Sequence, residues 1–464
     1  MGDSTVINVT DLIDRRPLGS LQIRILLLCG LAALLDGLDL QSIGLAAPAM
    51  IATLHVAPRA FAAVFSAALL GLMLGAFVLG PLGDRIGRKP ILIVSVLTFG
   101  LFTLGTAFVG DMQSLLVMRF LTGLGLGGAM PSFISLAAEA LPHHRRTVLI
   151  SVVWAGFPLG GVLGGLLASR IIPAFGWPSV FVVGGMLPLL LALVLLTALP
   201  ESISFLVARN TAPARIAALL GRLTGTAPPA ATRFVLADHL AQNVSVMRLF
   251  SEGRGTGTLL LWATYFLIFL MLVTNSAWSP TLLHVAGIEV QQSGLAMASF
   301  NLGSVVGTSL VGLLIHRFGP YLTLTLLFLA SALSMSAVGY AAPSVAMIIG
   351  LETLVGLFLG AGSSGLIALA PIYYPVAIRA TGVGWATTLG RFGSFCGPLA
   401  IGSLVAGAWG LGVIYAALGA PALLAAGLIA AFGLAANAAQ GTMAHLTAHE
   451  ARAAAPETDT SRAV

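Results

Sequence analysis

GPLGDRIGRKP, residues 80–90, is the most specific pattern in the chain. It separates two long apolar runs, so it predicts a short turn between two helices. Its glycines let the helices approach closely, and its carboxylate and basic side chains can form a charge network that locks them together. An ordinary basic turn is the alternative, but it requires neither the glycines nor the carboxylate. We assign this turn as a gating loop and expect Glu139, at the end of a later apolar run, to join its charge network. The residues assigned to it are Gly80, Gly83, Asp84, Arg85, Gly87, Arg88 and Glu139.

The composition around this turn is that of a membrane protein. Of the 464 residues, 58% are hydrophobic and only 8% are charged, and the mean hydropathy is +1.01. A soluble domain carries roughly 25% charged residues, so this chain has too little charge to cover a water-exposed surface. Its net charge of +6 comes mainly from arginines placed singly or in pairs beside apolar runs, which argues against nucleic-acid binding.

Twelve apolar runs are long enough to cross a bilayer, which takes about 20 residues per helix. They predict an all-α integral membrane protein with twelve transmembrane helices in two six-helix bundles. The expected divisions are an N-terminal tail (1–21), a first bundle (22–199), a central polar loop (200–257), a second bundle (258–436) and a disordered tail (437–464). The predicted spans are 22–46, 60–81, 90–109, 114–137, 147–171, 177–199, 258–284, 292–315, 321–341, 344–369, 381–406 and 409–435.

The distribution of basic residues predicts the orientation of these spans. Most of the 22 lysines and arginines share one side of the membrane if the N-terminus is placed in the cytoplasm. By the positive-inside rule, both termini and the central loop are then expected to be cytoplasmic.

The two halves of the chain resemble each other. The pattern RxxxGxxxG begins at Arg119 in the fourth span, and ExxxGxxxG begins at Glu352 in the tenth. Small residues spaced by four let membrane helices pack closely. The second copy of the loop is degraded, because His316 stands in place of Asp84. Parallel six-helix repeats are typical of transporters, with the substrate site between the halves near the membrane midplane.

LLDGLDLQSI, residues 34–43, places two carboxylates inside an apolar helix. A charge at the bilayer centre costs roughly 2.5–3.5 kcal/mol on insertion scales. Asp36 and Asp39 share one helical face, so they require a water-lined cavity, a cationic partner or a proton. Desolvation and mutual repulsion both favour the protonated form of a carboxyl group. We therefore expect the pair to gain and lose protons as a coupled unit; a static pair held by the backbone or an arginine is the alternative.

Further charged and polar side chains are expected inside the spans. Arg391 is expected either to bind a substrate carboxylate, which we favour, or to act as counter-ion to an internal acid. Arg119 is expected in the proton-coupling network, with Glu352 as its pseudo-symmetric opposite or as a separate proton site. Other side chains in cavity-lining spans complete the predicted substrate site, with simple packing as the alternative: Trp154, Phe157, Tyr265, Asn275, Asn301 and Trp385.

Four stretches resemble the aromatic acid:proton symporters of the major facilitator superfamily: LLDGLDLQSIGLAAPAM, RFLTGLGLGGAMPSFISLAAE, LPESISFL and IRATGVGWATTLGRFGSFCGP. They extend from the first span to the eleventh. The resemblance implies proton-driven import of acids such as 4-hydroxybenzoate or a hydroxyphenylpropionate across a bacterial inner membrane. It also implies functional roles for Asp36, Asp39, Asp84, Arg119, Glu139 and Arg391.

The sequence therefore predicts a proton-coupled carrier, not an enzyme, that imports a small aromatic carboxylate by alternating access. We expect a monomer in the lipid bilayer, with no nucleic-acid partner, no metal site and no cofactor, the proton gradient being the energy source. One alternative is a proton antiporter that exports drugs or metabolites, which the two buried arginines disfavour. A second is a non-transporting sensor of aromatic acids, for which the central loop is too short to hold a signalling domain.

Overall fold

The computed structural model describes residues 6–14, 18–209, 211–224, 233–235, 245–251, 253–342, 344–375 and 377–453. Twelve of its helices are long and apolar enough to cross a membrane, which confirms the predicted all-α fold with twelve spans. The first six are α2 (Ser20–Leu54), α3 (Phe61–Ile86), α4 (Arg88–Thr106), α5 (Met112–Ala140), α6 (His143–Phe175) and α7 (Pro178–Ala198). The second six are α10 (Gly255–Val285), α11 (Val290–Phe318), α12 (Pro320–Val338), α13 (Val345–Tyr373), α14 (Arg379–Ala406) and α15 (Leu411–Ala453).

The last helix is longer than the sequence indicated. A disordered tail was predicted from residue 437, whereas α15 continues as helix through Ala453. Alanine is abundant between residues 435 and 453, and it is the strongest helix former, so the chain extends the preceding helix there. Residues 454–464 lie outside the described part of the chain.

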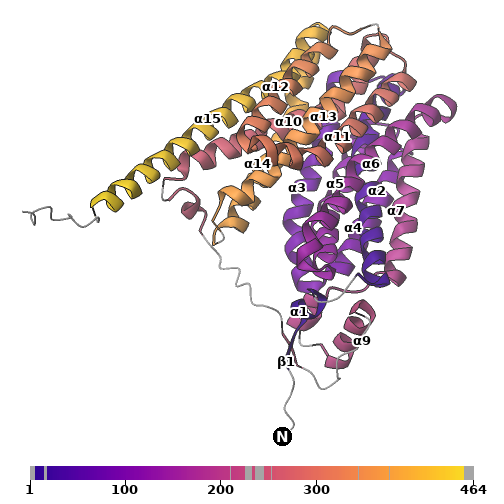
Figure 1. The fold of residues 1–464 in the computed structure, drawn as a ribbon. Coiled ribbons are helices and arrows are strands. Elements are labelled where there is room, and N and C mark those ends of the chain that lie inside the picture. The colour runs from indigo at the N-terminus through magenta and orange to yellow at the C-terminus, as the bar shows by residue number, and fades with distance from the viewer. Residues whose placement is uncertain are drawn as a thin grey trace, which may run out of the picture.

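Short elements lie beneath the first bundle at one end (Figure 1). They are β1 (Val6–Asn8), α1 (Val9–Asp14), α8 (Ile203–Ala208), α9 (Pro213–Thr224) and β2 (Arg233–Val235); η1 (Pro58–Ala60) and η2 (Val246–Leu249) are single 3-10 turns elsewhere. The strands β1 and β2 pair in parallel, with Val6 opposite Arg233. Apolar side chains such as Ile13, Ile216 and Leu220 join the core of the first bundle. Segments of the N-terminal tail and of the first part of the central loop are thus tied to that bundle, whereas Leu249 of η2 belongs to a different core cluster.

Glycines allow the closest helix crossings, and they do so at equivalent places in both halves. A Cβ at Gly123 of α5 would overlap the backbone of α3 at Ala68. A Cβ at Gly356 of α13 would overlap the backbone of α11 at Phe300 in the same way. These are the glycines of the two repeated patterns, so the sequence repeat corresponds to a repeated helix crossing in the structure.

The two bundles meet at one end and diverge at the other (Figure 1). At the end where they meet, Ser66 of α3 donates to the carbonyl of Phe395 in α14 over 3.1 Å. Gly44 of α2 lies against the backbone of α10, where an added Cβ would come 2.5 Å from the carbonyl of Ser276. We call this the joined end, and we call the opposite end, which carries residues 80–90, the loop end.

Candidate functional site

The two acids of α2 lie inside the protein. Asp36 is 4% exposed and Asp39 is 1% exposed. Between them, Gly37 lies so close to α6 that a Cβ would overlap the backbone of Phe157. This close crossing turns the acid-bearing face of α2 away from lipid, as the cost of charge in hydrocarbon requires.

Asp39 has a cationic partner within the first bundle. Its carboxylate accepts a hydrogen bond from Thr103 of α4, and the Nη1 atom of Arg119 in α5 lies 3.7 Å from it. Arg119 is 1% exposed, and it also donates to Thr106 over 2.8 Å and to Thr122 over 3.0 Å. The ion pair is therefore buried inside the first bundle and supported by hydrogen bonds. The three threonines were not among the residues predicted from the sequence.

Asp36 lacks such a partner among the described residues. Its Oδ1 atom is buried without a hydrogen bond, and no ion pair within 4.0 Å is formed. Its charge interacts instead at longer range with that of Arg391, which α14 contributes from the second bundle. Arg391 contacts the sulfur of Met130 in α5 over 3.2 Å, while its Nη1 atom is buried without a partner. The first bundle thus contributes an acid without a hydrogen bond at Oδ1, and the second contributes a guanidinium with one unpaired nitrogen, among the described residues.

Two stacked aromatic pairs lie at the depth of Arg391. Trp154 and Phe157 of α6 stack with ring centroids 5.7 Å apart, and Tyr265 and Phe269 of α10 stack at 5.9 Å. At 1.5 Å per residue, Trp154, Tyr265 and Arg391 each lie about 15–18 Å from the loop end of their helices. The rings of Tyr265 and Phe269 contact α14 at the glycine that precedes Arg391. The α10 pair therefore lies beside the residue that precedes Arg391, and the α6 pair lies at a similar depth in the other bundle.

The remaining predicted polar residues belong to other networks. Asn275 donates to Glu352 over 3.1 Å, and Ser279 donates to the same carboxylate over 2.7 Å. Glu352 is fully buried, and Tyr415 extends this network through Ser279.

Two further predicted ligands are also placed apart from Arg391. Asn301 is hydrogen-bonded to Gln41 of the other bundle. Trp385 stacks on Trp262 with ring centroids 5.8 Å apart and is 41% exposed. Their assignment as substrate ligands stays a prediction.

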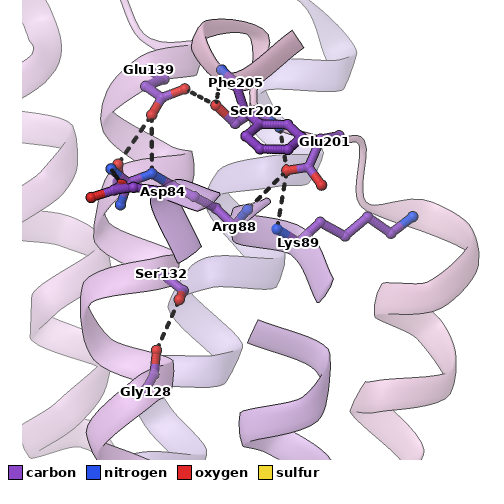
Figure 2. A network of polar contacts seen from close by, with 10 residues as sticks. Asp84, Arg88, Lys89, Gly128, Ser132, Glu139, Glu201, Ser202 and Phe205 are labelled. Carbon is purple, nitrogen blue, oxygen red and sulfur yellow. Dashed lines mark hydrogen bonds and ion pairs between the residues drawn. The ribbon is translucent and has the colours of Figure 1, made fainter. Parts of the chain in front are cut away.

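The loop of residues 80–90 forms a charge network with neighbouring helix ends (Figure 2). Arg88 pairs with Asp84 over 2.7 Å and with Glu139 of α5 over 3.4 Å. Glu139 accepts further hydrogen bonds from Ser202 and, over 3.1 Å, from Ser135. The expectation that Glu139 lies within reach of the Asp84 loop is confirmed.

A second acid, Glu201, caps the N-terminus of α4. It was not among the residues predicted from the sequence. The carboxylate of Glu201 accepts from the backbone N–H groups of Arg88 and Lys89, each over 3.1 Å (Figure 2). Gly87 has φ +119°, and a Cβ there would come 2.5 Å from that carboxylate. An acid just after the sixth apolar run is the available sequence signal, because a carboxylate stabilises the positive end of a helix.

Two six-helix bundles that meet at one end, with charged groups buried between them, define a membrane transporter of the two-bundle type. The chain belongs to the Major Facilitator Superfamily, whose model matches residues 29–398 and 261–444. Proteins of this family are transporters and not enzymes.

Curated relatives and solved structures agree with this placement. The chain is 38% identical to a gallate transporter of Pseudomonas putida, covering 92% of this chain and 95% of the relative. It is 37% identical to a 4-hydroxybenzoate transporter of Pseudomonas aeruginosa, covering 94% and 98% of the two chains. The fold is similar to the inward open conformation of the xylose transporter XylE from E. coli, with a TM-score of 0.70, 20% identity and coverage of 88% and 95%.

Proposed function

We propose that this protein is a proton-coupled symporter that imports an aromatic carboxylate, of the hydroxybenzoate or hydroxyphenylpropionate type, across a bacterial inner membrane by alternating access. The observation that carries the proposal is that Arg391 in one bundle and Asp36 in the other each keep a buried polar atom without a partner among the described residues, while α6 and α10 each carry a stacked aromatic pair. The names of the relatives support this substrate class, since gallate and 4-hydroxybenzoate are both hydroxylated benzoates.

The contacts of Arg391 suggest how the substrate binds. A thioether is a weak hydrogen-bond acceptor, so a carboxylate can displace Met130 and take both guanidinium nitrogens as a bidentate partner. The ring then lies between the aromatic pairs of α6 and α10. Such a pocket selects a flat anion, because it provides one cation and apolar ring faces.

The contacts of the two acids suggest which of them carries the proton. Asp39 already has Arg119 as a counter-ion, so its negative charge is balanced inside the first bundle. Asp36 has no cation within 4.0 Å among the described residues, so a proton is the available means of neutralising it. We assign Asp36 as the main proton carrier and Asp39 with Arg119 as the unit that holds it in place. The energy source is the proton gradient, and no cofactor takes part.

The proposed direction is import, and the orientation is compatible with it. The loop end carries most of the basic residues, so we assign it and both termini to the cytoplasm. The bundles diverge at that end (Figure 1), which corresponds to a state facing the cytoplasm. Release of proton and substrate in that state completes import.

The test is uptake of radiolabelled 4-hydroxybenzoate by the purified protein in liposomes with an alkaline interior. The unmodified protein should accumulate the acid above its external concentration. Asp36→Asn should abolish accumulation but retain exchange of labelled for unlabelled substrate, because the amide resembles a permanently protonated acid. Asp111→Asn is the matched control, since Asp111 is an exposed helix cap that accepts from Ser114.

Three results would reject the proposal or redirect it. Normal accumulation by Asp36→Asn would reject the proton assignment. Efflux of substrate against proton entry would indicate an antiporter that exports its cargo. Saturable binding without any flux would indicate a sensor.

A further inference from the structure

A reciprocal amide pair joins the two bundles between the site and the joined end. Gln41 of α2 donates to the side-chain oxygen of Asn301 in α11 over 2.9 Å, and Asn301 donates back to Gln41 over 2.7 Å. Gln41 is 5% exposed and Asn301 is 3% exposed. Gln41 lies about 8 Å beyond Asp36 along α2, so the pair covers the site on the side of the joined end.

The structure prepares both partners for this contact. Asn301 also donates to the carbonyl of Met297 in its own helix over 2.8 Å, which orients its amide. On the opposite side α6 passes so close that a Cβ at Gly161 would overlap both amides. A glycine at this position therefore makes room for the pair, whose hydrogen bonds join α2 to α11 beside α6.

We propose that Gln41 and Asn301 form a latch that holds the joined end closed and must separate whenever the carrier opens toward that side. The two side chains belong to different bundles, so rocking of the bundles must break both hydrogen bonds at once. Gln41 shares α2 with Asp36 and Asp39, so a movement of the acid-bearing helix acts directly on the latch.

Amides suit a contact that must open and close. While the latch is closed, each buried amide forms a hydrogen bond with the other. Without that partner, a polar group buried away from water would cost free energy. When the seam opens, water replaces the lost partners, so the net free-energy change per hydrogen bond is small. A buried ion pair at this position would leave two charges to be solvated at each cycle, which demands far more free energy.

The latch can be tested without any substrate, by measuring how often the joined end opens. Ser66→Cys, in a protein lacking Cys29 and Cys396, places a thiol in the α3–α14 seam of the joined end, and its modification by a polar maleimide reports opening. Gln41→Leu and Asn301→Leu should each raise the labelling rate about tenfold, because each leaves one buried amide unpaired in the closed state; tenfold corresponds to about 1.4 kcal/mol. Gly161→Ala should have the same effect without altering either amide.

A swapped pair keeps the test independent of folding defects. Gln41→Asn combined with Asn301→Gln restores an amide on each side, so its labelling rate should return toward that of the parent. Ser299→Ala is the matched control, because the hydrogen bonds that Ser299 of α11 forms with described residues, to Ala296 and Ile349, stay within the second bundle, so labelling should be unchanged. Equal labelling in all variants, or a swapped pair labelled as fast as the single variants, would overturn the latch. Failure of 4-hydroxybenzoate uptake would affect only the proposed function.

Discussion

Asp36 and Asp39 lie one turn apart on α2 and have different surroundings. Asp39 forms an ion pair with Arg119 that is supported by threonine hydroxyls, whereas the Oδ1 atom of Asp36 is buried without a hydrogen bond among the described residues. Hydrogen bonds to the charged groups are what make a buried ion pair tolerable, because they replace the water that both charges have lost. The difference between the acids therefore arises from their neighbours on α4, α5 and α14.

This arrangement predicts that Arg119 contributes to the stability of the fold. Arg119→Ala should lower the free energy of unfolding by about 3–5 kcal/mol, because it leaves Asp39 buried without a counter-ion. The double variant Arg119→Ala with Asp39→Asn should recover much of that loss. Thermal unfolding in detergent, followed by tryptophan fluorescence, measures both. If Arg119→Ala were as stable as the double variant, the unpaired Asp39 would not be the cause of the loss of stability.

The start of α4 depends on an acid from outside that helix. Glu201 accepts hydrogen bonds from the first backbone N–H groups of α4. The Arg88 side chain in the same turn forms ion pairs with Asp84 and Glu139. The glycine at position 87 gives the carboxylate room to reach the backbone. One short turn thus joins three helices of the first bundle, which accounts for its dense pattern of glycines and charges.

Removing this cap should loosen the first turn of α4. Glu201→Ala should raise amide hydrogen exchange at Arg88 and Lys89 about fivefold, which corresponds to a loss of about 1 kcal/mol for a helix cap. Glu201→Gln retains an acceptor oxygen and should have a smaller effect. Unchanged exchange in the alanine variant would mean that the carboxylate does not support this helix.

The bundles act as two bodies because their contacts with each other differ from their internal contacts. Inside each bundle, glycine crossings bring helix backbones together at several depths, whereas between the bundles Gly44 and Gly165 do so near the joined end. Between bundles, the contacts described above gather at the joined end and at Met130 with Arg391. Movement about such a seam can open one end while closing the other and leave both bundles intact.

A covalent link across the joined end should therefore stop transport without unfolding the protein. A Cβ at Gly165 of α6 would lie 3.0 Å from the Cβ of Ala298 in α11 and 2.7 Å from the carbonyl oxygen of Gly294, so the two helices must shift apart slightly to reach the roughly 3.5–4.5 Å between the Cβ atoms of a disulfide. Gly165→Cys with Ala298→Cys should lose more than nine-tenths of its uptake on oxidation and regain it with dithiothreitol. Each single cysteine variant is the control. Full uptake by the oxidised, cross-linked protein would contradict rocking at this seam.

Local features of the chain were sufficient to predict the membrane fold. Twelve apolar runs, the glycine patterns that follow Arg119 and Glu352, and the charges of residues 80–90 all correspond to observed helices, crossings and ion pairs. Apolar length and helical spacing depend on neighbouring residues only, so they can be read in order along the chain. The burial of Asp36 and Asp39 follows from the same reasoning, because lipid does not tolerate either as a free charge.

Which side chains pair with each other could be seen only in the folded structure. Nothing near Asp36 or Asp39 in sequence distinguishes the acid that has Arg119 beside it from the acid that does not. Gln41 and Asn301 are separated by 260 positions, and the cap of α4 comes from Glu201, more than 100 positions away. Such contacts depend on which helices the glycine crossings bring together and at what depth. Spans and buried charges are therefore properties of local sequence, whereas the pairing of those charges results from packing between distant helices.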